Sequence, residues 1–364
     1  MDFTFSEEQE QLREAVRGFL IRESPSEYWR KMLEDPRGFT DAVWDQLIQL
    51  GWTGLLAPEE YGGLGLGMVD LAVVMEEMGR VPFPGPFFSS AVFATLAAHA
   101  LGLEDKLTDL AAGKVRGCVA LEENGHGDVV GRIRARGSRR TGRWRVSGNK
   151  SVVVDGHTAD FALVAARTQA GIGTFLIENP AAELIPTWDG TRKIARLNLD
   201  DTPAEPVGPE CDHSAIWRHV VDDAGIALCA ELVGSCERAS DLAVDYAKQR
   251  VQFGRPIATF QVIKHKTVDM LHKLELSRVG THHAAWASDV EDPRREESAA
   301  MAKAFVTEAA NFITGECIQI HGGVGFTWEA DPHVFYRKAK QTDLLLGYHG
   351  THRARVADLF LART

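Results

Sequence analysis

Residues 224–243 have the sequence AGIALCAELVGSCERASDLA, which is rich in small side chains. It belongs to a long helix that we predict over residues 221–250, in which small residues recur along the whole length. Small side chains let helix axes approach each other closely, so we expect this helix to be buried in a bundle. The small residues are Ala224, Gly225, Ala227, Ala230, Gly234, Ala239 and Ala243.

Helical patterns extend in both directions from this segment. On the C-terminal side they continue to the end of the chain, and we predict a C-terminal helical bundle over residues 209–364. Near the N-terminus, Ser6 and Gln9 have capping-box spacing before a predicted helix over residues 6–22. We therefore predict an N-terminal α-helical domain over residues 1–114.

The middle of the chain has a different texture. Short runs rich in β-branched residues, such as residues 152–154, 161–164 and 174–177, are separated by Gly, Asn and Asp. Such runs predict a small β-barrel or sandwich, and we place a middle β domain over residues 115–208. The fold class is therefore α+β, in the order helical, β, helical.

The composition excludes several functional classes. Among 364 residues, 40 Lys and Arg face 51 Asp and Glu, and the net charge of −11 disfavours sequence-independent nucleic-acid binding. Five scattered cysteines without CxxC spacing favour reduced thiols, and the acidic N-terminus is unlike a signal peptide. We therefore expect a cytoplasmic protein. The sequence has no apolar run long enough to predict a membrane span.

The common nucleotide and hydrolase motifs are absent. The chain has no GxxxxGK[ST], no GxGxxG after a strand, no HExxH and no GxSxG. His265, Asp269 and His272 have a spacing that would place them on one helix face, but polar stripes of this kind are common on exposed helices. We predict no metal site.

Three stretches have a chemistry that needs explanation. They are a glycine-rich loop over residues 51–67, the segment RVQFGRPI over residues 250–257, and the segment QIHGGVGFTWE over residues 319–329. An arginine with an aromatic residue can hold a phosphate and stack on a base, and a Gly-Gly pair lets backbone approach a ligand. Each stretch alone is equally compatible with a tight turn or with helix packing.

Together and in this order, the three stretches resemble the acyl-CoA dehydrogenase family. The opening residues Phe3, Phe5 and 7–9, the run at residues 76–80, and Asp331 with His333 are also similar. The resemblance implies an N-terminal helical domain, a middle β-barrel or sandwich and a C-terminal four-helix bundle. It also implies FAD as cofactor, α,β-dehydrogenation of an acyl-CoA thioester in fatty-acid or steroid degradation, and an electron-transfer flavoprotein as electron acceptor.

The resemblance further implies which residues contact the cofactor. In this family one subunit holds the flavin ring, and its neighbour grips the pyrophosphate and adenosine. The matching residues for the second role are Arg250, Gln252, Phe253, Ile257, Phe260, Gln319, Ile320 and Gly323.

The residues expected at the flavin ring are replaced. Val152 stands where the family usually has Trp, and Val154 stands where it has the Thr that bonds to flavin N5. Valine neither stacks like an aromatic ring nor donates a hydrogen bond. The usual Pro- and Gly-containing loop is replaced by residues 120–128, ALEENGHGD, which lack the proline.

The catalytic carboxylate is also missing from its usual place. An ungapped count from the Gly-Gly pair reaches Leu346, and a three-residue insertion reaches His349 in a Tyr-His-Gly-Thr run. An earlier position that some members use falls on Ala224, and Glu231 lies about two helical turns later. Glu231 and His349 are the two candidate bases. Glu231 is equally compatible with a helix residue paired with a nearby cation.

These departures resemble the partner-type subunit of heteromeric acyl-CoA dehydrogenases, including those that shorten steroid side chains. We expect this chain to complete the FAD site of an α2β2 enzyme with a related subunit. Two alternatives remain open. The chain is a self-sufficient homo-oligomeric dehydrogenase with a displaced base, or it is a non-enzymatic structural or acyl-binding partner of the same fold.

Overall fold

The computed structural model describes residues 5–123 and 127–362, and the chain divides into two compact units. The first, which we call the helical unit, combines Met1–Pro25, Met68–Phe83 and Gly225–Thr364. The second, the sheet unit, combines Ser26–Gly67 and Pro84–Ala224. Each is described on its own. The division into three consecutive domains stays a prediction.

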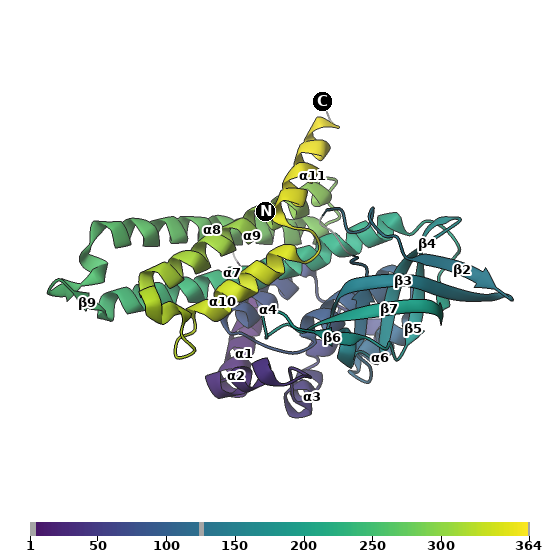
Figure 1. Ribbon diagram of the computed structural model, residues 1–364, viewed down its shortest axis with the longest axis horizontal. Coiled ribbons are helices and arrows are strands. Elements are labelled where there is room, and N and C mark those ends of the chain that lie inside the picture. Colours follow the sequence, from purple (N-terminus) through teal and green to yellow (C-terminus); the bar gives the residue numbers. More distant parts are fainter. Residues whose placement is uncertain (1–4, 124–126, 363–364) are drawn as a thin grey trace. The chain divides into compact units, whose positions relative to one another are not determined.

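Long antiparallel helices make up the helical unit, and Figure 1 shows them running side by side. The chain reverses direction between α7 and α8 through a two-stranded hairpin at the tip of these helices. The elements are α1 (Glu7–Glu23), α4 (Met68–Arg80), α7 (Ser214–Gln249, whose first residues belong to the sheet unit), β9 (Val251–Gln252), β10 (Arg255–Pro256), η5 (Ile257–Thr259), α8 (Gln261–Asp289), α9 (Arg295–His321), η6 (Gly322–Phe326), α10 (Pro332–Leu344) and α11 (His349–Leu361).

The small residues of α7 allow a close crossing with α4. A Cβ added to Gly234 would lie 1.8 Å from the carbonyl oxygen of Glu76, and one added to Gly79 would lie 1.9 Å from that of Glu231. Ser235 donates a hydrogen bond of 2.9 Å to the Gly79 carbonyl across the same crossing. The two backbones therefore pack without intervening side chains, and the prediction that α7 is buried in a bundle is confirmed.

The start of α1 follows its sequence signal. The Ser6 hydroxyl accepts a hydrogen bond from the Gln9 backbone, and the Gln9 side chain accepts one from the Ser6 backbone. This capping box satisfies two backbone N–H groups that the helix itself leaves unpaired. Phe3, which belongs to the opening pattern noted above, lies outside the described residues.

An eight-stranded mixed sheet forms the centre of the described part of the sheet unit. Hydrogen-bonded neighbours follow the order β6-β7-β3-β2-β4-β5-β8, and β1 lies parallel to β4. The strands are β1 (Gly117–Ala120), β2 (Arg136–Arg140), β3 (Arg143–Val154), β4 (Phe161–Thr168), β5 (Gly171–Glu178), β6 (Glu183–Ile185), β7 (Ile194–Pro203) and β8 (Glu205–Val207).

One face of this sheet carries the core of the unit. Trp144 and Phe175 meet at 5.1 Å between ring centroids, and both belong to a cluster of buried side chains mostly from β1, β3, β4, β5 and β7. Helices precede the sheet in the chain: α2 (Ser26–Glu34), α3 (Asp41–Gln49), η1 (Trp52–Gly54), η2 (Glu59–Tyr61), η3 (Phe87–Ala94), α5 (Thr95–Ala100) and α6 (Glu104–Ala111), with η4 (Gly156–Thr158) after β3. Of these, η3 is a π-helix. No helix in the described residues is long and apolar enough to span a bilayer.

Candidate functional site

The hairpin between α7 and α8 presents most of the predicted cofactor residues. Gln252 pairs with Arg255, and the two residues between them, Phe253 and Gly254, have φ angles of 52° and 76°. Two positive φ values in a two-residue loop match the turn that suits a hairpin's twist. This turn leaves the Phe253 side chain 92% exposed. The strained backbone of this turn therefore holds the Phe253 ring away from the core of the helical unit.

Cations and rings lie together at this hairpin. The Arg255 guanidinium lies 4.4 Å from the Phe260 ring centroid, and the Phe253 and Phe260 rings meet edge to face at 6.0 Å. The Ile257 amide donates to the Arg250 carbonyl at 2.8 Å, which fixes the backbone of Arg250 while its side chain is exposed. The structure adds Arg255 to the candidate cofactor residues, because its guanidinium stacks on Phe260. No sequence pattern indicated this stacking, apart from the short separation of the two residues along the chain.

The end of α9 lies against the end of α7. The His321 and Tyr246 rings stack with 4.4 Å between centroids, so the Gly-Gly turn and the hairpin belong to one corner of the helical unit. Gln319 and Gly323 are exposed there, and a Cβ at Gly323 would meet nothing within 4 Å. Ile320 is instead buried and packs inside the helical unit.

This corner fits the nucleotide half of FAD. Exposed guanidinium groups and a Gln amide are donors suited to a pyrophosphate, and Phe253 and Phe260 offer faces for an adenine ring. Open backbone at Gly323 allows close approach of a ligand. Arg250, Gln252 and Phe253 are exposed, so they fit a nucleotide that approaches the helical unit from outside.

The described residues at the flavin-ring positions do not fit a flavin ring. Val154 is buried, Val152 is half-buried, and neither side chain has a hydrogen-bonding group. Val152 forms an isolated backbone bridge with Glu122, at the start of the replaced loop. Asn124, Gly125 and His126 of that loop lie outside the described residues.

Glu231 is engaged in a buried ion pair. Its Oε1 lies 2.6 Å from Nζ of Lys338 on α10, and both side chains are at least 95% buried. A carboxylate in this position is neutralised by a cation and shielded from solvent. The geometry matches the structural role that the sequence left open for Glu231.

His349 has a different environment, at the first turn of α11. Its Nδ1 lies 2.9 Å from Oδ2 of Asp343, and its backbone N–H donates to Oδ1 of the same carboxylate at 3.1 Å. Asn311 on α9 donates to Oδ2 of Asp343 at 2.9 Å. The His349 side chain is about one-third exposed. No sequence pattern pointed to Asp343, because only the short connection between α10 and α11 brings it to the imidazole.

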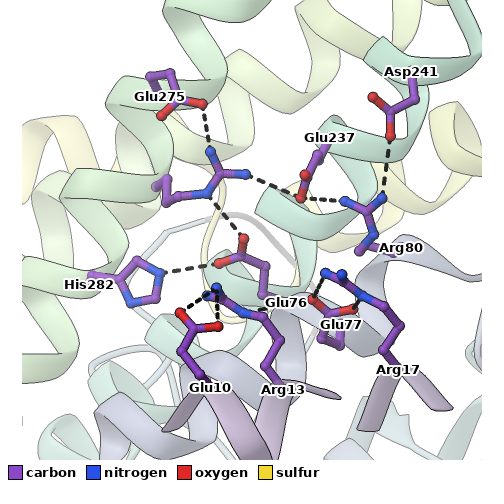
Figure 2. Close-up of polar contacts among 11 residues, drawn as sticks. Glu10, Arg13, Arg17, Glu76, Glu77, Arg80, Glu237, Asp241, Glu275 and His282 are labelled. Atoms are coloured by element: carbon purple, nitrogen blue, oxygen red, sulfur yellow. Dashed lines mark hydrogen bonds and ion pairs between the residues drawn. The ribbon is translucent and has the colours of Figure 1, made fainter. Parts of the chain in front are cut away.

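The Glu76-Glu77 run is the centre of a network of ion pairs within the helical unit (Figure 2). Arg278 and His282 on α8 each lie 3.1 Å from a Glu76 carboxylate oxygen, and Arg17 on α1 contacts Glu77 at 2.7 Å. Burial on its own raises the pKa of Glu76, but the hydrogen bond from His282 and the charge of Arg278 hold that pKa below its usual range. The run therefore fastens α1, α4 and α8 together. The other members of the network are Glu10, Arg13, Arg80, Glu237, Asp241 and Glu275.

The three polar residues whose spacing could suit a metal ion lie on α8. His265, Asp269 and His272 are exposed. Within residues 5–123 and 127–362, no group of three or more His, Cys, Asp or Glu side chains is arranged to hold a metal ion.

Comparisons with known proteins agree with this geometry. Residues 219–361 match a family model described as acyl-CoA dehydrogenase, C-terminal domain, and residues 6–105 match the corresponding N-terminal domain. The acyl-CoA dehydrogenase IpdE2 of Mycobacterium tuberculosis is 32% identical over 343 residues, covering 93% of each chain.

Two solved structures of heteromeric or steroid-related members are also similar. The ChsE4-ChsE5 complex from Mycobacterium tuberculosis has a TM-score of 0.90 and 26% identity, and the match covers 100% of both chains. A variant of the steroid ACAD Tcur3481-Tcur3483 has a TM-score of 0.89 and 29% identity, with 98% of each chain covered.

Proposed function

The chain belongs to the acyl-CoA dehydrogenase family, and we propose that it completes the FAD site of a heteromeric enzyme that dehydrogenates an acyl-CoA thioester. The family and the fold expected from the resemblance, with helical N- and C-terminal domains and a middle sheet, are confirmed. Members of this family are FAD-binding flavoproteins. When bound, the flavin accepts a hydride, and the protein supplies binding, orientation and proton transfer.

A single observation carries the proposal. The nucleotide-type residues of the hairpin are kept and face away from their own unit, whereas the flavin-ring positions hold Val152 and Val154. One chain that offers half of a cofactor site needs a second chain to supply the other half. Arg250 and Arg255 then neutralise the pyrophosphate, and Phe253 and Phe260 cover the adenine.

The relatives support a related subunit as the partner. The ChsE4-ChsE5 structure is a complex, and the Tcur3481-Tcur3483 protein is a steroid ACAD. We propose an α2β2 assembly acting on an acyl-CoA of fatty-acid or steroid origin, with an electron-transfer flavoprotein as acceptor. Because the predicted contacts act on a cofactor held by the partner, the isolated chain should retain little FAD and show no turnover.

Flavin stoichiometry tests this proposal. In the complex with a related subunit we expect one FAD per two chains, and we expect the Arg250→Ala variant of that complex to lose its flavin on gel filtration. Arg353→Gln is a matched control, since Arg353 is an exposed arginine on α11, away from the hairpin. Unchanged flavin content in Arg250→Ala would refute the assigned contacts. One FAD per chain would instead support a self-sufficient dehydrogenase, and failure to bind FAD with any partner would support a non-enzymatic role.

The self-sufficient enzyme is the second candidate function, and the environment of His349 favours it. An imidazole held by a carboxylate is a common arrangement for general bases. Glu231, the other candidate base, is neutralised by Lys338.

A further inference from the structure

We propose that Asp343 and His349 form a proton-transfer dyad, in which His349 Nε2 accepts the α-proton of an acyl thioester and Asp343 is the positioning residue. The inference rests on the proposed acyl-CoA chemistry, because removal of hydrogen from Cα requires a base. It alters the division of labour that the resemblance implies, since this chain then keeps a base of its own.

The hydrogen bonds around Asp343 set the tautomer of His349. The carboxylate accepts three hydrogen bonds, from the His349 backbone, from His349 Nδ1 and from the Asn311 amide. Burial raises the pKa of the Asp343 carboxyl, but the hydrogen bonds from His349 and the nearby positive charge of Lys303 hold it below its usual range. The carboxylate therefore stays ionised and can only accept, so Nδ1 carries the hydrogen.

The other ring nitrogen is left available. With the hydrogen on Nδ1, Nε2 of the neutral ring presents a lone pair, and among residues 5–123 and 127–362 none of the hydrogen bonds of His349 uses it. The ring is partly exposed, so a ligand can reach it. The negative charge of Asp343 also stabilises the imidazolium that forms when Nε2 takes a proton.

The surrounding charges distinguish His349 from its neighbours. Lys303 on α9 is buried and donates to the Thr342 carbonyl at 2.8 Å. His352, one turn along α11, donates from Nε2 to the Leu346 carbonyl, and burial together with Lys303 lowers its pKa to about 4. His352 is therefore a neutral packing residue, whereas His349 faces an anion on α10.

The proposed step balances without an oxidant. The Cα–H bond breaks, its electron pair remains on the thioester as an enolate, and the proton moves to Nε2. In D2O the imidazolium exchanges with solvent and returns a deuteron to Cα. The thioester is regenerated with deuterium at Cα, and no hydride leaves the substrate.

Exchange in D2O tests this step separately from dehydrogenation. The probes are 3-thia-acyl-CoA thioesters of short and long chain, in which sulfur replaces the β-methylene so that no β-hydride can be removed. The full-length chain without its partner is incubated with each probe, and deuterium at Cα is measured by mass spectrometry. The exchange rate is measured at a series of pH values.

The variants separate catalysis from folding. General-base catalysis contributes about 10²- to 10⁴-fold, so His349→Gln should lose exchange by that factor while keeping the wild-type melting temperature within a few degrees. Asp343→Asn should lower the rate at least about tenfold and shift the pH profile to lower pH, because a neutral amide no longer stabilises the imidazolium. Arg353→Gln, on the same helix and exposed, should exchange like the wild type.

Two results overturn the proposal. They are no exchange in the wild-type chain with either probe, and an unchanged rate and pH profile in His349→Gln. Flavin retention is measured in parallel in the complex with a related subunit, with and without Arg250→Ala. Failed exchange by the chain, with Arg250-dependent flavin binding in the complex, overturns the dyad alone. Exchange by the chain, without such binding in the complex, overturns the proposed FAD site alone.

Discussion

Gly234→Ala tests whether the fold depends on the close crossing of α4 and α7. The added Cβ would lie 1.8 Å from the Glu76 carbonyl oxygen and 3.0 Å from the Arg80 amide nitrogen. Both are backbone atoms, which cannot rotate away as a side-chain end can. The helices must therefore separate by more than about 1 Å to restore normal contact distances.

The magnitude follows from two opposing effects. Overpacking a tight interior costs about 1–3 kcal/mol, and sometimes more. Replacing Gly by Ala within a helix returns about 1 kcal/mol. The reciprocal contact between Gly79 and the Glu231 carbonyl, at 1.9 Å for an added Cβ, limits how far the helices can slide. Overpacking should therefore reach the upper end of its range, about 3 kcal/mol, which leaves a net loss of about 2 kcal/mol of unfolding free energy.

Gly225→Ala is the matched control on the same helix. A Cβ at Gly225 meets nothing within 4 Å, so only the helix-propensity gain applies. This variant should be more stable than the wild type by about 0.5–1 kcal/mol. The two alanines should thus differ by at least about 2 kcal/mol, although both are Gly→Ala changes in α7.

Calorimetry and amide hydrogen exchange measure this difference. A change of 1 kcal/mol shifts the melting temperature by about 2–4 °C in a unit of 150–250 residues, so the two variants should melt at least about 4 °C apart. Exchange should also accelerate in α4 and α7 of Gly234→Ala. Equal melting temperatures for the two variants would show that the crossing is not tight, and the argument from small residues would fail.

Three further changes probe buried ionisable groups. Lys338→Met leaves the Glu231 carboxylate buried without its cation. Unfolding in urea should therefore show a loss of about 3–5 kcal/mol of unfolding free energy, which the double variant Lys338→Met with Glu231→Leu should largely restore. A single variant as stable as the double variant would contradict this. The pKa of His352 is lowered from 6.5 to about 4, so stability should fall by up to about 3 kcal/mol as the pH drops from 6.5 to 4, and an unchanged acid limb in His352→Gln would argue against the assignment. Burial raises the pKa of Asp155 to about 6. The stability that the protonated carboxyl of Asp155 contributes is therefore lost as the pH rises from about 4 to 6. Asp155→Asn, which tolerates the same positive φ, should therefore gain up to about 3 kcal/mol over the wild type at pH 7 and nothing at pH 4, and equal urea midpoints at pH 7 would count against it.

Local signals predicted the elements that depend on local physics. The capping box of Ser6 and Gln9 and the small-residue pattern of α7 are short-range features, and both appear as expected. Within the predicted N-terminal helical domain, the structure has a π-helix over Phe87–Ala94 followed by α5. The π-helix places its residues almost entirely in the core, which periodicity based on 3.6 residues per turn does not describe.

Partners that meet only through tertiary structure were beyond the sequence. The cation that neutralises Glu231 is Lys338, on a helix far along the chain, and no spacing rule connects the two. Asp343 is close to His349 in sequence, but its role depends on the turn between α10 and α11. The hairpin residues were named from the resemblance, and the structure adds Arg255 through its contact with Phe260.

The exposed hairpin also affects how a cell would handle variants of this protein with substitutions at Phe253. Phe253 is almost wholly outside the core, so a polar substitution there costs little folding free energy. Chaperones and proteases act on unfolded chains, and they would pass such a variant at normal abundance. In the proposed assembly it would occupy a place beside a normal partner and leave the cofactor loosely held. Substitutions at this hairpin would therefore lower the activity of the assembled enzyme while the amounts of both proteins stayed constant.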